Sequence, residues 1–283
     1  MSGKRNPWIN VILVLAVLAF VGFSMIPLLG TAFKQQQPST VATPTPTSTI
    51  SGEKRTEIEA QVKGYESVLK REPQNPTALR GVVEGKLQLG DIKGAIVPLE
   101  EFAKLNPNQT DYTVLLAQLK QRTGDPEGAA LAYREILTTK PGDLNALQGY
   151  AELQIAQKRP EAAIALIQDT LKTANQLNDV QAGTVDVPSV QLLLGLVYAS
   201  QQRYTEALVI YDEAIRVNKQ DFRPVLAKAM ILKQQGKTAE AQSLFTTAVS
   251  LAPAQYKDQV KRQATESAQP SATPTPPPPN QTP

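Results

Sequence analysis

The 283-residue chain contains neither cysteine nor histidine. Without cysteine there is no disulfide, no thiolate nucleophile, no iron–sulfur ligand and no lipid-modified N-terminal cysteine. Without histidine the usual general base and the commonest metal ligand are missing, which excludes Ser-His-Asp triads and the usual zinc sites. We therefore expect no metal, no cofactor and no enzymatic activity.

The excess of basic over acidic residues is confined to the N-terminus. Of 29 Lys and Arg residues, Lys4, Arg5 and Lys34 flank an apolar run, and the remaining 26 equal the 26 Asp and Glu residues. A surface that binds phosphate backbones needs a basic footprint, which a neutral domain lacks. We expect no nucleic-acid partner.

The carboxylates also lack the spacing of a known site. No glycine-rich phosphate loop is present, and no two carboxylates are paired in a recognisable pocket. Aspartates 143, 169, 179 and 186 are scattered in turns rather than set at calcium-loop spacing. We expect these aspartates to cap helices.

An apolar segment from Trp8 to Leu29 follows a short basic N-terminus, residues 1–7. Its length corresponds to roughly 33 Å of helix, against a bilayer core of about 30 Å. This predicts a single transmembrane helix in a plasma or thylakoid membrane. A cleaved signal peptide is the alternative, because the small residues Gly30-Thr31-Ala32 resemble a cleavage site. Lys4 and Arg5 before the segment, against Lys34 after it, weakly favour a cytoplasmic N-terminus with the remaining chain on the opposite side.

Two Pro-rich segments enclose the central region. Residues 30–52 are polar and rich in Pro and Thr, which predicts a flexible linker, and residues 266–283 predict a disordered Pro-rich tail. The region between them, residues 53–265, is therefore the predicted folded domain.

Within that domain, Pro73, Pro107 and Pro141 recur at one fixed interval. One unit has Leu194-Gly195 before Tyr198, followed by Ala207, Tyr211 and Ala214. These residues, and a period of about 34 residues, resemble the tetratricopeptide-repeat family. The resemblance implies an all-α helical solenoid of about five helix-turn-helix units, with a capping helix near residues 53–71.

The interval between the third and fourth repeat units is ten residues longer than the repeat period, which places an insertion near residues 178–187. We expect a loop between the third and fourth units. It is either a mobile flap beside a binding groove or a tolerated surface insertion.

In this family the first helix of each unit lines a concave groove that binds protein partners. In the first three units the matching positions are polar, and Arg80, Gln118 and Gln148 are our candidate contacts. In the last two units they are apolar: Leu192, Leu196, Leu226 and Met230. An exposed apolar strip indicates an interaction site, whereas cover by the insertion or by a helix near Tyr256 would make the same residues core.

The combined features predict a membrane-anchored adaptor that binds a protein through its groove and assists assembly or localisation of a membrane complex. Anchor, Thr-Pro linker and repeats together resemble thylakoid-associated members of the family, including the one that binds protochlorophyllide oxidoreductase. That resemblance implies repeats on the cytoplasmic side, against the charge count. A secreted or periplasmic carrier and a subunit of a cell-envelope machine are the alternatives. The sequence leaves the oligomeric state open.

Overall fold

Twelve α-helices and no β-strand make up residues 51–266, the part of the chain that the computed structural model describes. The prediction of an all-α fold is confirmed. None of these twelve helices combines the length and apolar character needed to cross a bilayer. The predicted transmembrane segment 8–29, nearly all of the linker 30–52 and the tail 267–283 lie outside the described residues.

The described residues form two compact units, residues 51–190 and residues 191–266. The chain passes from the first to the second within helix α10 (Val187–Ser200). We refer to them as the N-terminal unit and the C-terminal unit.

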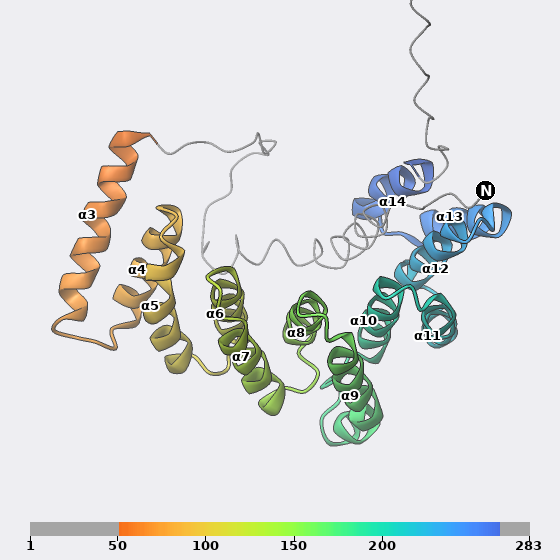
Figure 1. Cartoon of the computed structure of the whole chain (residues 1–283), viewed down its shortest axis with the longest axis horizontal. Coiled ribbons are helices and arrows are strands. Elements are labelled where there is room, and N and C mark those ends of the chain that lie inside the picture. The colour runs from red at the N-terminus through yellow and green to blue at the C-terminus, as the bar shows by residue number, and fades with distance from the viewer. Residues whose placement is uncertain (1–50, 267–283) are drawn as a thin grey trace, which may run out of the picture. The chain divides into compact units, whose positions relative to one another are not determined.

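The N-terminal unit begins with a single helix, α3 (Gly52–Leu69), where a capping helix is predicted. Three helix pairs follow, and within each pair the second helix packs against the first (Figure 1). The pairs are α4 (Pro76–Gln88) with α5 (Ile92–Leu105), α6 (Thr110–Arg122) with α7 (Pro126–Thr139), and α8 (Leu144–Ala156) with α9 (Pro160–Val180).

The C-terminal unit continues the pattern of paired helices. After α10 come α11 (Tyr204–Val217), α12 (Phe222–Gln234), α13 (Thr238–Leu251) and a last helix, α14 (Ala254–Glu266). Helix α12 packs against α11 and α13, and α14 packs against α13. The five predicted helix-turn-helix units are therefore all present.

Each pair turns at one residue in the left-handed backbone conformation. Glycine occupies this place in three turns, at Gly90, Gly124 and Gly236, with φ between 79° and 88°. The register of the repeat places Lys158 and Gln202 at the same point of the other two turns, and both have φ near 60°. Glycine adopts this conformation without the steric cost that a side chain brings. Two of the five turns therefore adopt the same backbone geometry with an unfavourable residue.

Polar side chains cap the helices that follow the turns. Asp91 Oδ1 accepts a hydrogen bond from Gly94 N at 2.9 Å, and Asp125 Oδ1 accepts one from Gly128 N at 2.8 Å. Asp143 caps α8 through Ala146 N at 3.0 Å. Such caps satisfy backbone donors that have no partner inside the helix. The prediction that Asp143 is a capping residue is confirmed. The same prediction is wrong for Asp169 and Asp179, which lie within α9 rather than in turns.

Glycines within the helices allow close contact with tyrosine rings. A Cβ atom at Gly81 in α4 would lie 2.4 Å from the Tyr65 ring of α3, and one at Gly195 in α10 would lie 2.2 Å from Tyr211 Cε1 of α11. No side chain larger than hydrogen fits at these places. Small residues in one helix therefore make room for rings of its neighbour, which is how helix pairs bury a shared core.

The non-helical loop in the insertion is shorter and more ordered than the loop predicted over residues 178–187. Helix α9 continues to Val180 and is 21 residues long, against 14 for α7, so the first part of the insertion is helical. Asn178 then fixes the turn: its Nδ2 donates to Val185 O at 3.0 Å, and its Oδ1 accepts from Val185 N at 2.8 Å. Val185 is buried. The expectation of a loop along the whole insertion is wrong, and these bonds favour a structural insertion over a flap.

Candidate protein-binding surfaces

The first helices of the three pairs in the N-terminal unit, α4, α6 and α8, carry the predicted polar contacts. Helices α6 and α8 contact each other directly, although they belong to successive pairs. Positions one repeat period apart occupy the same place on successive first helices. We call the six residues at two such positions the polar face: Arg80, Glu84, Val114, Gln118, Gln148 and Glu152.

Arg80 is exposed on α4, where a partner can reach it. Its Nε lies 3.6 Å from Glu84 Oε1, one helical turn further along the same helix. Partial burial raises the pKa of the Glu84 carboxyl, and the charge of Arg80 opposes this rise. Exposed ion pairs of this kind contribute little to stability, so Arg80 can exchange Glu84 for a carboxylate of a ligand at small cost.

On α6 the same two positions hold Val114 and Gln118. Gln118 is exposed, and Val114 is largely buried beside it, with 9% of its surface accessible. The Gln118 amide offers two donors and an acceptor. It is therefore suited to the backbone of an extended peptide.

On α8 the positions hold Gln148 and Glu152, and Gln148 Nε2 donates to Glu152 Oε1 at 2.9 Å. Desolvation by the surrounding protein raises the pKa of the Glu152 carboxyl, while the bond from Gln148 lowers it. Gln148 is half-buried. The pair presents a carboxylate already oriented by its neighbour.

Hydrogen bonds between successive helix pairs hold the polar face together. Asn145 of α8 hydrogen-bonds the side chain of Asp111 in α6, whose carboxyl pKa is raised first by burial and then by the charge of Asp143. Thr110 Oγ1 donates to Asp143 Oδ2 at 2.6 Å. The polar face on α6 and α8 is thus fixed before any partner binds.

The apolar candidates lie in the C-terminal unit and are buried. Leu192 and Leu196 in α10 are 1% and 3% accessible, and Leu226 and Met230 in α12 are 3% and 7% accessible. Leu226 and Met230 belong to one buried cluster with Val260 of α14, against which Tyr256 packs. The prediction of an exposed apolar strip is wrong, and the alternative that these residues are covered is the one observed.

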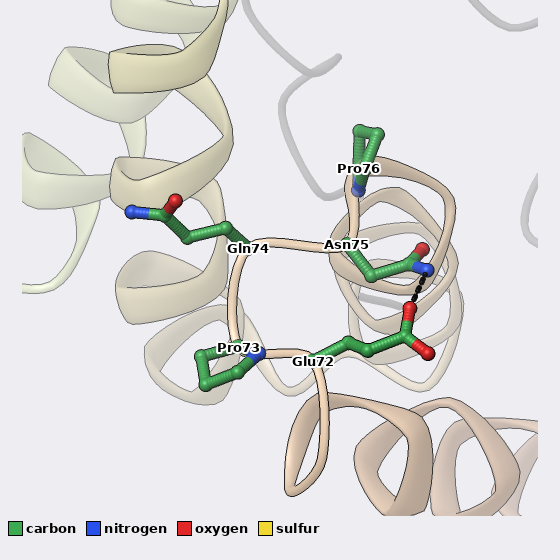
Figure 2. Close-up of a pocket in the computed structure, with 5 residues that line it drawn as sticks. All are labelled: Glu72, Pro73, Gln74, Asn75 and Pro76. Carbon is green, nitrogen blue, oxygen red and sulfur yellow. Dashed lines mark hydrogen bonds between the residues drawn. The ribbon is translucent and has the colours of Figure 1, made fainter.

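A small hollow of about 610 Å³ lies in the loop between α3 and α4 and is lined by Glu72, Pro73, Gln74, Asn75 and Pro76. Figure 2 shows Asn75 turned towards Glu72 and Gln74 directed away from them. Asn75 Nδ2 donates to Glu72 Oε2 at 2.7 Å, and Asn75 Oδ1 accepts from Ala78 N at 3.0 Å. Both residues are engaged in shaping the turn, and a single carboxylate offers no acid–base pair.

Two further features follow from the repeat spacing, although we did not predict them. Val260 lies one repeat period after Leu226 and is fully buried, so it repeats the apolar position on α14. Lys158 lies one period after Gly124 and shares its left-handed turn. Extending the register by one more period would have found both.

Comparison with protein families agrees with this geometry. Residues 121–183, 190–220 and 224–255 each match a family model described as tetratricopeptide repeat. Tetratricopeptide repeats are therefore present in α7 to α9, in α10 to α11 and in α12 to α13. The structure is an all-α helical solenoid of this type, a scaffold suited to protein binding.

Several known proteins resemble the chain, among them a plant protein and a yeast protein. Protein SLOW GREEN 1, chloroplastic, from Arabidopsis thaliana is 26% identical over 198 residues, which cover 70% of this chain and 61% of the relative. The crystal structure of yeast Tom70 aligns with a TM-score of 0.51 and 15% identity, over 88% of this chain and 47% of that chain. At this identity the likeness to Tom70 concerns the fold alone.

Proposed function

We propose that this protein is a membrane-tethered scaffold that binds a protein partner through the polar face and performs no chemistry itself. The observation that carries the proposal is that each of the three first helices carries an accessible polar side chain on the polar face. Arg80 and Gln148 occupy one repeat position, and Gln118 occupies the other, because the buried Val114 fills the first position on α6. Donors and acceptors on successive helices suit an extended segment of a partner, because such a segment presents backbone groups along its length.

The chemistry of the polar face defines the partner further. The polar face carries Arg80 beside Glu84 on α4 and a second carboxylate, Glu152, on α8, with Gln118 between them on α6. A strongly acidic or strongly basic segment would meet a like charge at one end. We propose a partner segment with both signs of charge and polar residues between them.

The tether in this proposal is the apolar segment 8–29, whose length and lack of charge suit a bilayer. The relative from Arabidopsis is named as a chloroplast protein. A chloroplast location is compatible with a thylakoid rather than a plasma membrane, and we propose assistance to a photosynthetic complex as the role. Alkaline carbonate extraction of native membranes tests the tether: the chain should remain with the membranes, and release into the supernatant would contradict it.

Crosslinked co-purification from native membranes tests the polar face. We compare the unaltered chain with an Arg80→Glu, Gln118→Glu variant. The matched control is Lys93→Glu, Gln176→Glu, which makes similar changes at exposed places on the second helices α5 and α9. Loss of a defined partner from the first variant alone is expected. Retention of the partner by that variant, or equal loss from both, overturns the proposed binding face.

A further inference from the structure

The second helices of the N-terminal unit carry an exposed apolar residue at one fixed position of the repeat. Val97 of α5 and Leu131 of α7 are 70% and 66% accessible, and Ala165 of α9 is exposed one repeat period later. Because successive helix pairs repeat one geometry, these residues form a row across α5, α7 and α9, which follow one another along the unit (Figure 1). We call the three residues the second-helix ridge.

The second-helix ridge lies opposite the buried side of each helix. Two residues along a helix rotate the side chain by about 200°, and the residues two before and two after each ridge position are buried. These pairs are Ala95 and Leu99, Ala129 and Tyr133, and Ala163 and Ile167. Substitutions on the ridge should therefore leave the core of the unit intact.

Acidic residues flank the second-helix ridge. Residues four before and four after a ridge residue lie beside it on the same helix face. Of the six residues at these places, five are acidic and the sixth is Lys93. The five, which we call the acidic flanks, are Glu101, Glu127, Glu135, Glu161 and Asp169. Four of them are exposed, and Glu101 is half-buried.

The acidic flanks are only partly neutralised by the protein itself. Lys104 Nζ lies 2.9 Å from Glu101 Oε1. This hydrogen bond raises the pKa of Lys104, and the charge of Glu135 on the next second helix adds to the rise. Within residues 51–266, neither Glu127 nor Asp169 forms an ion pair. Helices α5, α7 and α9 together carry seven acidic and four basic residues, so their net charge is negative.

We propose that the second-helix ridge and its acidic flanks bind a basic amphipathic helix of a protein partner, which lies across α5, α7 and α9. Such a helix has an apolar stripe with Lys or Arg on both sides. The stripe would remove the exposed surface of Val97 and Leu131 from water. Its cations would meet carboxylates on both sides of the ridge, which fixes the choice of partner by charge.

The acidic flanks disfavour two other occupants. An anionic membrane surface attracts Lys and Arg and would repel these carboxylates. A second copy that packed its own ridge symmetrically against this one would bring like charges together. The inference goes beyond the proposed function and does not depend on it, because the polar face belongs to the first helices.

Fluorescence anisotropy measures this binding with the full-length chain in phosphatidylcholine nanodiscs. The probe is a labelled helical peptide of Leu and Lys, with Leu along one face and Lys on both sides of it. A second peptide has Glu in place of every Lys. We expect the Lys peptide to bind above the level of empty nanodiscs, and the Glu peptide to bind at least tenfold more weakly. Added salt should weaken the Lys peptide several-fold, because exposed charges are screened.

Charge reversal tests the acidic flanks. Glu127→Lys with Asp169→Lys should weaken binding of the Lys peptide at least tenfold. The matched control is Glu53→Lys with Glu57→Lys, which changes the net charge equally at exposed places on α3. This control should change binding by less than twofold.

Removal of the apolar side chains tests the second-helix ridge. Val97→Gln with Leu131→Gln should weaken the Lys peptide at least threefold without changing the melting temperature. The control, Leu105→Gln with Val217→Gln, replaces exposed apolar residues outside the ridge and should have less than a twofold effect.

A benzoylphenylalanine in the Lys peptide locates the contact, and crosslinks to α5, α7 and α9 are expected. Crosslinks to α4, α6 and α8 would place the peptide on the polar face and overturn the inference. The Arg80→Glu, Gln118→Glu variant should bind the peptide as the unaltered chain does, so the two proposals fail separately.

Four further results would overturn the inference. Equal weakening by the ridge variants and their controls would show that the contact is nonspecific. Equal binding of the two peptides would show that charge plays no part. Self-association of the unaltered chain that Leu131→Gln abolishes in sedimentation would assign the ridge to a second copy. Binding of phosphatidylglycerol vesicles that the same substitution abolishes would assign it to a membrane.

Discussion

Tyr133 of α7 packs directly against Gly149 of α8, so that a Cβ atom at Gly149 would lie 2.4 Å from Tyr133 Cζ. The ring is 1% accessible, and burial raises the pKa of its hydroxyl above its ordinary value. The contact joins the second helix of one pair to the first helix of the next. Close approach of these helices therefore depends on the missing side chain at position 149.

Gly149→Ala should lower the free energy of unfolding by about 1–3 kcal/mol, the usual range for overpacking a well-filled core. Urea denaturation measures the change. Gly64→Ala is the matched control, because Gly64 is exposed on helix α3 and a Cβ there meets nothing within 4 Å. The control should gain about 0.5–1 kcal/mol, since alanine favours helix. A similar effect of both substitutions would contradict the steric argument.

Lys158→Gly should raise the free energy of unfolding by about 0.5–1 kcal/mol. The left-handed conformation costs a residue with a side chain about 1–2 kcal/mol, and glycine removes this cost. The greater freedom of glycine in the unfolded chain offsets part of the stabilisation. Gly124→Lys, at the equivalent turn, should lose a similar amount. Lys172→Gly within α9 should also lose about 1 kcal/mol. If Lys158→Gly destabilises as much as Lys172→Gly, backbone strain at position 158 is unimportant.

Asn178→Ala should detach the turn after α9, because it removes both hydrogen bonds to Val185 and leaves the Val185 N–H unpaired, while Val185 O keeps its hydrogen bond from Val187 N. A loss of about 1–3 kcal/mol is expected. Amide hydrogen exchange at Val185 should accelerate, while exchange within α6 should not. Asn175→Ala, on an exposed face of the same helix, serves as the control and should change stability by less than about 0.5 kcal/mol.

The raised carboxyl pKa of Glu152 has a consequence for the pH dependence of stability. The native chain keeps this proton at pH values where the unfolded chain, with a pKa near 4.5, has lost it. The contribution of Glu152 to the free energy of unfolding therefore falls as pH rises through that window. Glu152→Gln should gain stability relative to the unaltered chain between pH 4 and pH 7.

Glu213→Gln should show the opposite trend, because hydrogen bonding to Arg216 lowers the pKa of the Glu213 carboxyl. Chemical denaturation at pH 4 and pH 7 measures both differences. Parallel trends for the two variants would contradict the assignment for Glu152.

The repeat was recognisable in the sequence, because its spaced prolines and small residues are local features. These residues resembled the tetratricopeptide-repeat family, and that resemblance implied five helix pairs and the capping helix. The polar residues of the N-terminal unit were also predicted to be accessible, and Arg80 and Gln118 are exposed. Their part in binding a partner remains a prediction.

The sequence could not show that Leu192, Leu196, Leu226 and Met230 are buried, because accessibility depends on what packs against a helix from elsewhere. Leu226 occupies the same repeat position as the exposed Arg80, yet it shares a buried cluster with Val260 from α14. The insertion shows the same limit: only in three dimensions does Asn178 meet Val185 and fix the turn. The sequence by itself determined the repeat, its period and the chemistry it excludes. Tertiary packing decided which apolar residues are covered, since burial is a property of the assembled helices and not of any one of them.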